Sequence, residues 1–336
     1  MNHIMAVCDG EEPYASKLVH YLNAKDNFPF DVRHFADMEK MQDFSKDRNV
    51  DVALVSQEFY EKARQEGFVD RLILLQEKEQ EYERNIPGVW KYQSCEKMVK
   101  EIMEHLSKDP GKELWINRKT SMKLIGFYSP IKRNLQTSFA FTLGQLLGKK
   151  HKVLYINLEG NSGLSRLINR NFHKDMSDLL YSIQNQKTGI SFLLGSITEH
   201  INGLDILPPM MCQPDLISVT GKEWRTLFEE LEKYTEYEYI LLDLSDSIQG
   251  LFDILRQCTR IYTITGDDGF AMAKADQYEK MLLQCHYEDV LEKTNKCSFP
   301  RFTNLPAGLE GMTVSELAGK VKEIIKKDFC KEEVAG

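Results

Sequence analysis

The chain has 336 residues, of which 42% are hydrophobic and 28% are charged. This length suits about two domains, and the composition is that of a folded globular protein rather than a disordered chain. The formal net charge of −8 argues against a protein that binds nucleic acid over a broad surface. No apolar run approaches the ~18 residues that a membrane span needs.

Seven cysteines and eight histidines are scattered along the chain. The cysteines form no C-x-x-C pair, and the histidines show no H-x-x-x-H spacing. This pattern predicts reduced thiols rather than a disulfide framework or a zinc site. The first residues, MNHIMAVCDG, have neither a charged n-region nor a long apolar h-region. The sequence therefore predicts a cytoplasmic protein without a signal peptide.

Short apolar runs alternate with amphipathic stretches over the first predicted domain, residues 1–107. The apolar alternation and the period-four spacing predict strands at 3–8, 30–35, 50–56, 71–76 and 89–93 and helices at 13–24, 38–44 and 94–106. Strands that alternate with helices form a mainly parallel sheet covered on both faces. The expected fold class is therefore α/β, with a three-layer α/β/α arrangement.

A stretch rich in charges, with Pro and Gly, predicts a linker at 108–121, and a second alternating series fills the second predicted domain, 122–336. Strands are expected at 122–129, 152–158, 204–209, 237–246 and 260–266. Helices are expected at 137–150, 220–235, 269–285 and 312–329. This series again predicts an α/β/α domain.

The segment 126–148, GFYSPIKRNLQTSFAFTLGQLLG, has the order of strand, loop and helix that phosphate-binding loops follow. Glycines in such loops permit φ > 0 and let backbone N–H groups approach the phosphates. A lysine neutralises phosphate charge and a Ser or Thr hydroxyl binds magnesium. An aspartate at the end of a second strand orders the metal.

This order of elements resembles the MinD/ParA superfamily of deviant P-loop ATPases. The family's loop runs S-P-K-G-G-V-G-K-T-S, and the positions that match it here are Ser129, Pro130, Thr137 and Ser138. The remaining positions depart from it. The signature lysine falls on Ile131, the three glycines on Lys132, Arg133 and Leu135, and the phosphate lysine on Gln136. The chain thus matches the family at the two ends of the loop, but it lacks most of the residues that bind phosphate in the family.

This chain also lacks some of the acidic residues that the family has. The strand after the helix ends in D-x-D in the family, and here it reads Asn157, Leu158, Glu159. The resemblance implies that Glu159 would orient the attacking water. Asp243, in ILLDLSD, matches the metal-ordering aspartate of the family.

Two alternatives follow from these departures. In the first, the loop is a plain strand-to-helix connection and the protein is a non-catalytic pseudo-ATPase with no cofactor. Ile131 and Leu135 suit a left-handed turn poorly, which favours this alternative. In the second, ATP and magnesium bind through relocated cations. That degenerate nucleotide site would comprise Lys132, Arg133, Gln136, Thr137, Ser138 and Asp243, with Thr137 and Asp243 on magnesium and Asp243 and Glu159 as catalytic residues.

The first domain resembles a receiver domain in its order of elements but lacks the phospho-acceptor. Cys8 and Asp9 take the place of the acidic pair, Ser56 that of the acceptor aspartate and Gln76 that of the hydroxyl, while Lys91 keeps the lysine. One carboxylate cannot both accept phosphate and hold magnesium. We therefore expect a pseudo-receiver in which Asp9 is a solvated loop residue or a helix cap.

A receiver-like domain followed by a MinD/ParA-like domain is similar to TadZ/CpaE-type proteins of Tad (Flp) pilus assembly. The resemblance implies a homodimer that organises a pilus or secretion assembly at the cytoplasmic membrane face through protein contacts, with no nucleic acid partner. The last helix carries an apolar stripe among lysines. Such a helix either docks on the core or lies on a membrane surface.

Overall fold

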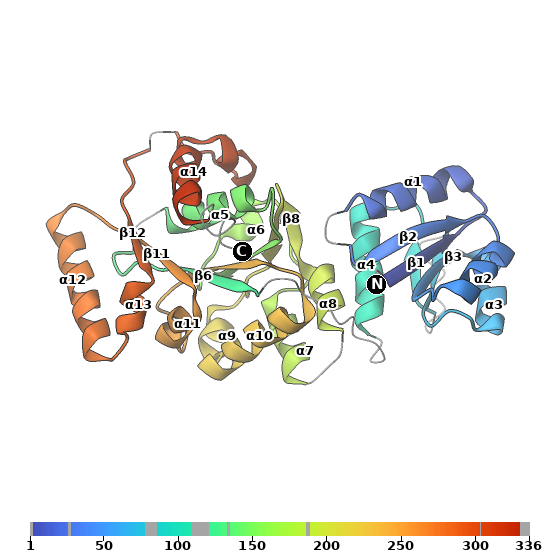
Figure 1. Ribbon diagram of the computed structural model, residues 1–336, viewed down its shortest axis with the longest axis horizontal. Coiled ribbons are helices and arrows are strands. Elements are labelled where there is room, and N and C mark those ends of the chain that lie inside the picture. The colour runs from blue at the N-terminus through green and yellow to red at the C-terminus, as the bar shows by residue number, and fades with distance from the viewer. Residues whose placement is uncertain are drawn as a thin grey trace. The chain divides into compact units, whose positions relative to one another are not determined.

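The computed structural model describes residues 3–25, 28–77, 86–108, 121–132, 135–185, 189–302 and 304–329. The chain divides into two compact units, Met1–Lys112 and Glu113–Gly336 (Figure 1). The domain limits drawn from the sequence, 1–107 and 122–336, stay a prediction. Most of the predicted linker, 108–121, lies outside the described residues.

Unit 1 contains a five-stranded sheet in the order β2-β1-β3-β4-β5, with every neighbouring pair parallel. This order is typical of flavodoxin-like doubly wound folds. The strands are β1 (His3–Cys8), β2 (Phe30–Phe35), β3 (Val52–Ser56), β4 (Leu72–Gln76) and β5 (Gly88–Trp90). The helices are α1 (Glu12–Asn23), α2 (Met38–Asp47), α3 (Gln57–Glu66) and α4 (Cys95–Ser107).

The alternation along β1 builds three layers in unit 1. Ile4 and Ala6 belong to one apolar cluster with Met41 of α2. Met5 and Val7 are fully buried, and the period of two directs them to the opposite face. Helix α1 packs on β1 and contacts α4. The predicted α/β/α arrangement of this region is confirmed.

Unit 2 contains a seven-stranded sheet in the order β12-β11-β6-β10-β7-β9-β8. All pairs are parallel except β8 with β9. These two form a hairpin through Asn202 and Gly203, whose φ values of 51° and 84° suit a type I′ turn. The strands are β6 (Lys123–Phe127), β7 (Val153–Leu158), β8 (Glu199–Ile201), β9 (Leu204–Leu207), β10 (Tyr239–Leu244), β11 (Arg260–Ile264) and β12 (Thr294–Cys297).

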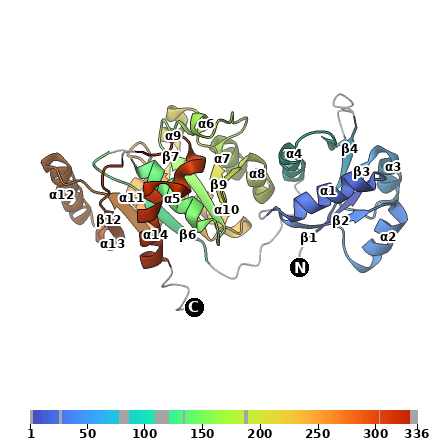
Figure 2. The same cartoon turned by 90° about the horizontal axis from the view of Figure 1, so that it is seen from above.

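Helices cover both faces of this sheet (Figures 1 and 2). They are α5 (Gln136–Leu147), α6 (Leu164–Leu167), α7 (Met176–Gln184), α8 (Ile190–Ile197), α9 (Gln213–Ser218), α10 (Gly221–Tyr234), α11 (Leu251–Gln257), α12 (Gly269–Gln284), α13 (Glu288–Glu292) and α14 (Glu316–Asp328), with a 3₁₀ turn, η1 (Leu309–Val314). Leu124 packs in the cluster that contains α7, α8, α10 and α11, whereas Ile125 packs in the cluster that contains α5 and α14.

Gly144 of α5 faces leucine side chains of the sheet. A Cβ atom at this position would come within 2.8 Å of the Leu204 side chain and 2.9 Å of Leu241. A larger residue there would therefore displace both leucine side chains. The first turn of α5, which follows β6, lies at the carboxyl ends of β6 and β10.

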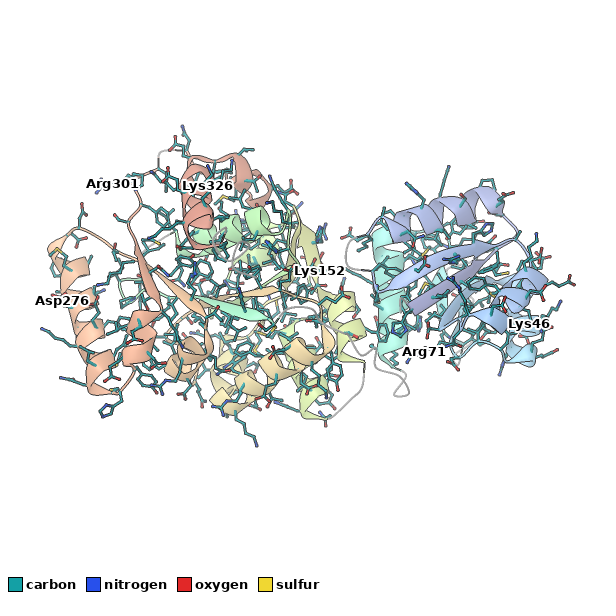
Figure 3. All side chains as sticks on the ribbon, viewed as in Figure 1. Lys46, Arg71, Lys152, Asp276, Arg301 and Lys326 are labelled. Carbon is teal, nitrogen blue, oxygen red and sulfur yellow. The ribbon has the colours of Figure 1, made fainter. Side chains whose placement is uncertain are left out.

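The last helix, α14, packs on α5 rather than standing free. Leu317 and Val321 are fully buried in the cluster they share with α5. Lys326, labelled in Figure 3, is exposed on the outer surface. Of the two alternatives for this helix, core docking is the one observed here, and contact with a membrane surface stays a prediction. No described helix is long and apolar enough to cross a membrane.

Candidate functional site

The strand order of unit 2 places a topological switch point between β6 and β10. The connection that leaves β6 crosses over β10 to reach β7, whereas the connection that leaves β10 crosses over β6 to reach β11. The two connections therefore diverge at the carboxyl ends of β6 and β10. Open α/β sheets bind their ligands at such a point. The segment that resembles a phosphate loop begins here, after β6.

The alternation of β7 and β10 gathers three polar side chains beneath α5. Tyr155 packs in the cluster that contains α5. Asn157 is two residues further along β7 and faces the same side. Asp243 is directly opposite Asn157 in the parallel register, and Leu241 is opposite Tyr155. Register and pleat together therefore place Tyr155, Asn157 and Asp243 side by side under the first turn of α5.

Neutral donors surround the carboxylate of Asp243, which is fully buried. Its Oδ1 accepts a hydrogen bond of 2.7 Å from Nε2 of Gln136. Its Oδ2 accepts one of 2.7 Å from the Tyr155 hydroxyl and one of 3.2 Å from Nδ2 of Asn157. The Gln136 amide also donates to the carbonyl of Leu244 at 2.9 Å. Gln136, at the position of the family's phosphate lysine, thus binds the aspartate directly.

The electrostatics of this cluster favour protonation of its two acids. Burial raises the pKa of Asp243 above its ordinary value, against the opposing effect of its hydrogen-bond donors. Burial, followed by the charge of Asp243, raises the pKa of Glu159 to about 7. Among the described residues, the hydrogen-bond partners of both acids are uncharged. A buried carboxylate without a cation is costly, which explains the direction of both shifts.

The loop before α5 keeps a left-handed backbone without glycine. Lys132 has φ of 51° and Leu135 has φ of 94°, and the resemblance puts two of the family's glycines at these positions. Each such residue costs about 1–2 kcal/mol relative to an ordinary conformation. Ile131 is buried and its backbone is not in the left-handed region, so the strained conformation is at Lys132 instead. The ammonium of Lys132 lies 2.5 Å from Asp246. Arg133 lies outside the described residues.

The other predicted residues lie at the edge of this cluster. The Thr137 hydroxyl is 3.5 Å from the Glu159 carboxylate, at the limit of a hydrogen bond. The carbonyl of Ser138 accepts from the hydroxyl of Thr142 at 2.6 Å, and the Ser138 side chain makes no hydrogen bond to the described residues of the cluster. In the described part of the chain, no group of three or more His, Cys, Asp or Glu side chains could hold a metal.

The residues present fit a magnesium nucleotide poorly. A triphosphate needs cations beside the phosphates, and magnesium needs accessible carboxylate or hydroxyl oxygens. Asp243 already accepts from three side chains, and the Lys132 ammonium is paired with Asp246. Gln136 cannot replace a lysine because its amide carries no charge. The arrangement acts chemically as a buried polar network that joins α5 to β7 and β10.

Unit 1 has a different polar cluster at the carboxyl end of its sheet. Asp9 is only 2% exposed, so the expectation of a solvated residue is wrong. Its Oδ2 lies 2.8 Å from the buried ammonium of Lys91, which follows β5. Its Oδ1 accepts from the backbone N–H of Glu11 at 2.8 Å, just before α1 begins. Ser56 and Gln76 are also buried, at the ends of β3 and β4.

Sequence reasoning missed two residues of these clusters. Tyr155 was not predicted, because a tyrosine within a buried strand is indistinguishable from an ordinary core residue. Its position two residues before Asn157, on the same face of the strand, could have indicated it. Asp246, which binds Lys132 and lies 3.5 Å from the Tyr128 hydroxyl, lies three residues beyond Asp243. A second acid so soon after that strand end was a usable signal.

Comparisons with known proteins give likenesses of fold over part of the chain. No protein-family profile and no curated protein matches the sequence. A ParA family ATPase from Chlorobium tepidum is similar with 16% identity, over 59% of this chain and 81% of that one, at a TM-score of 0.46. A plasmid partition protein from Borrelia burgdorferi is similar with 16% identity, over 62% of this chain and 100% of that one, at 0.45. A chain of the MinC:MinD cell division complex from Aquifex aeolicus is similar with 18% identity, over 52% of this chain and 68% of that one, at 0.38. The site above is defined by this chain's own contacts.

Proposed function

We propose that this protein is a MinD/ParA-like scaffold that does not turn over nucleotide and that acts through protein contacts. The observation that carries the proposal is the hydrogen bonding of Asp243 on both carboxylate oxygens. Both of its carboxylate oxygens accept hydrogen bonds from neutral groups, namely Gln136, Tyr155 and Asn157. A magnesium ion would need those same oxygens, directly or through its water ligands. Nucleotide binding would therefore have to break a buried network first.

The finer proposal is that the scaffold organises a pilus or secretion assembly, as a homodimer at the cytoplasmic face of the membrane. It draws support from the similarity to TadZ/CpaE-type proteins and from the order of two α/β units along the chain. Dimer contacts would then be fixed side-chain contacts, because no bound nucleotide is needed to complete them.

A second candidate is a nucleotide-dependent switch of the MinD/ParA type. The observation that favours it is the left-handed backbone at Lys132 and Leu135, which a plain connection would not need to maintain. In that case Lys132 would leave Asp246 to approach the phosphates, and Gln136 would leave Asp243 to free the metal ligand.

Sedimentation velocity combined with a phosphate-release assay separates the two candidates. For the scaffold we expect the same oligomeric state with and without millimolar Mg-ATP, and phosphate release no faster than in the Asp243→Ala variant. A shift to dimer only with Mg-ATP, together with turnover that Asp243→Ala abolishes, would overturn the proposal in favour of the switch.

A further inference from the structure

A cavity of about 320 Å³ lies beside the site described above, on the other face of the sheet. Three segments form it: the end of β6, the loop from β10 into α11, and the turn before α13. Its lining residues are Tyr128, Asp246, Ile248, Gly250, Leu251, Phe252, Asp253 and Tyr287. The cavity is open to solvent and has both polar and apolar walls, and its volume is at the lower limit of small-molecule sites, about 300 Å³.

Aromatic rings form its walls. The ring of Phe252 lies 5.3 Å from that of Tyr287 and 6.4 Å from that of Tyr278. The ring of Tyr128 lies 5.5 Å from that of Tyr278, behind the lining. The faces of such rings are electron-rich and attract cations, while their edges pack on one another.

A guanidinium group already stacks on Tyr287, outside the cavity. The Arg256 side chain lies over the ring of Tyr287 at 4.4 Å, where hydrogen bonds of about 3 Å to Asp289 hold it. Neither Arg256 nor Asp289 lines the cavity. The contact shows that the ring of Tyr287 can stack on a planar cation.

Two carboxylates give the cavity its charge. The Tyr128 hydroxyl donates to Asp246 at 3.5 Å, and the Tyr287 hydroxyl donates to Asp253 at 3.4 Å. Burial raises the pKa of both tyrosines, so both keep the proton that they donate. Asp246 is also paired with Lys132, and the charge of Asp253 acts on the nearby Arg256. Both cations lie outside the lining, so the lining residues themselves carry two negative charges.

We propose that this cavity binds a small organic cation, a guanidinium or alkylammonium group, held between the aromatic walls and Asp253. An anionic ligand such as a nucleotide would face two carboxylates, and their charge disfavours its binding. The cation is either a free amine or guanidine or the side chain of an arginine or lysine in a partner protein, and both share this chemistry. The proposal is independent of the function proposed above, since the cavity lies across the sheet from Asp243.

Titration of the full-length protein with methylguanidine, followed by NMR chemical shifts, tests the proposal. Methylurea is the matched probe, because it has nearly the same shape without the charge. We expect saturable shifts with methylguanidine and none with methylurea. Asp253→Asn and Phe252→Leu should each weaken binding by about tenfold, equivalent to about 1.4 kcal/mol. Asp276→Asn, the same charge change on the outer face of α12 (Figure 3), should leave binding unchanged.

A second titration distinguishes the two sources of the cation. A short peptide with one central arginine that binds at least about tenfold more tightly than methylguanidine indicates a partner's side chain. Equal affinities indicate a free small molecule, and both results support the cavity as a cation site. No saturable binding of methylguanidine at millimolar concentration, or binding that Asp253→Asn and Asp276→Asn weaken equally, overturns the proposal.

Discussion

Each of the two sheets has a buried aspartate at its carboxyl edge, and the two units stabilise this aspartate in different ways. In unit 1, the buried Asp9 is neutralised by the buried ammonium of Lys91 at 2.8 Å. In unit 2, the buried Asp243 is stabilised by an amide, a phenol and a second amide, without a described cation. An ion pair offsets the buried charge of Asp9, whereas burial among neutral dipoles raises the pKa of Asp243. The same architecture therefore places a cation beside the buried aspartate in one unit and only neutral donors beside it in the other.

We expect the largest loss of stability from breaking the ion pair of unit 1. Lys91→Met leaves Asp9 buried without its cation and should destabilise unit 1 by about 3–5 kcal/mol. Urea titration followed by hydrogen exchange of the β1 and β3 amides measures the loss. The double variant Lys91→Met with Asp9→Asn removes both charges and should recover most of the stability. A loss below about 1 kcal/mol in the single variant would contradict the ion-pair account.

The next effect is the pH dependence of unit 2. The pKa of Glu159 is about 7 in the folded protein against an ordinary value of 4.5. The folded state holds the proton more tightly, so this stability is complete below the ordinary pKa and is lost as pH rises through about 7. With allowance for partial exposure, we expect about 1–2 kcal/mol of loss between those values. Burial shifts the pKa of Asp243 in the same direction.

Unfolding free energies measured across this pH range check the prediction. Glu159→Gln should flatten the slope, because the amide cannot titrate. A variant that keeps the full slope would assign the pH dependence to other groups.

A smaller effect comes from the same substitution in both units. Asp243→Asn keeps an oxygen that can accept from Gln136 and removes a charge that no described cation offsets, so it should cost less than about 1 kcal/mol. Asp9→Asn leaves the Lys91 ammonium with Glu11, 3.2 Å away, as its remaining partner, and should cost more. Thermal unfolding of the two variants compares their losses of stability. A larger loss for Asp243→Asn than for Asp9→Asn would show that the negative charge of Asp243 stabilises unit 2.

The smallest expected effect concerns the strained loop. Lys132→Gly relieves a left-handed φ of 51° and should raise the stability of unit 2 by about 0.5–1 kcal/mol. Lys132→Ala removes the same contact with Asp246 but keeps the strain, so it serves as the matched control. If both variants change stability equally, the backbone carries no strain at this position.

Much of this arrangement was predictable from local pattern. The alternation of strands and helices predicted both α/β sheets. The loop frame from Ser129 to Ser138 was identified from the sequence, and the strand order places it at the switch point. Gln136 and Asp243 were both predicted site residues. The short edge strands β8 and β12 were missed, because EHI and TNKC carry too little apolar alternation to indicate a strand.

The partners within the clusters could not be predicted, because they depend on register between distant strands. Asp243 lies opposite Asn157 only after β7 and β10 pair, and Tyr155 joins them through the same pairing. Likewise the sequence does not indicate that Lys91 reaches back to Asp9, a residue on the loop after β1. Propensity determines the elements, whereas these contacts are determined by packing.

The central claim is that Gln136 and its neighbours close the site at Asp243 to a magnesium nucleotide. Calorimetric titration with Mg-ATP of the native chain and of a Gln136→Lys, Asn157→Asp variant tests it most directly. We expect no binding heat for the native chain at millimolar nucleotide, and measurable binding once the lysine and the second acid are restored. Micromolar binding by the native chain, with no gain in the variant, would contradict the account.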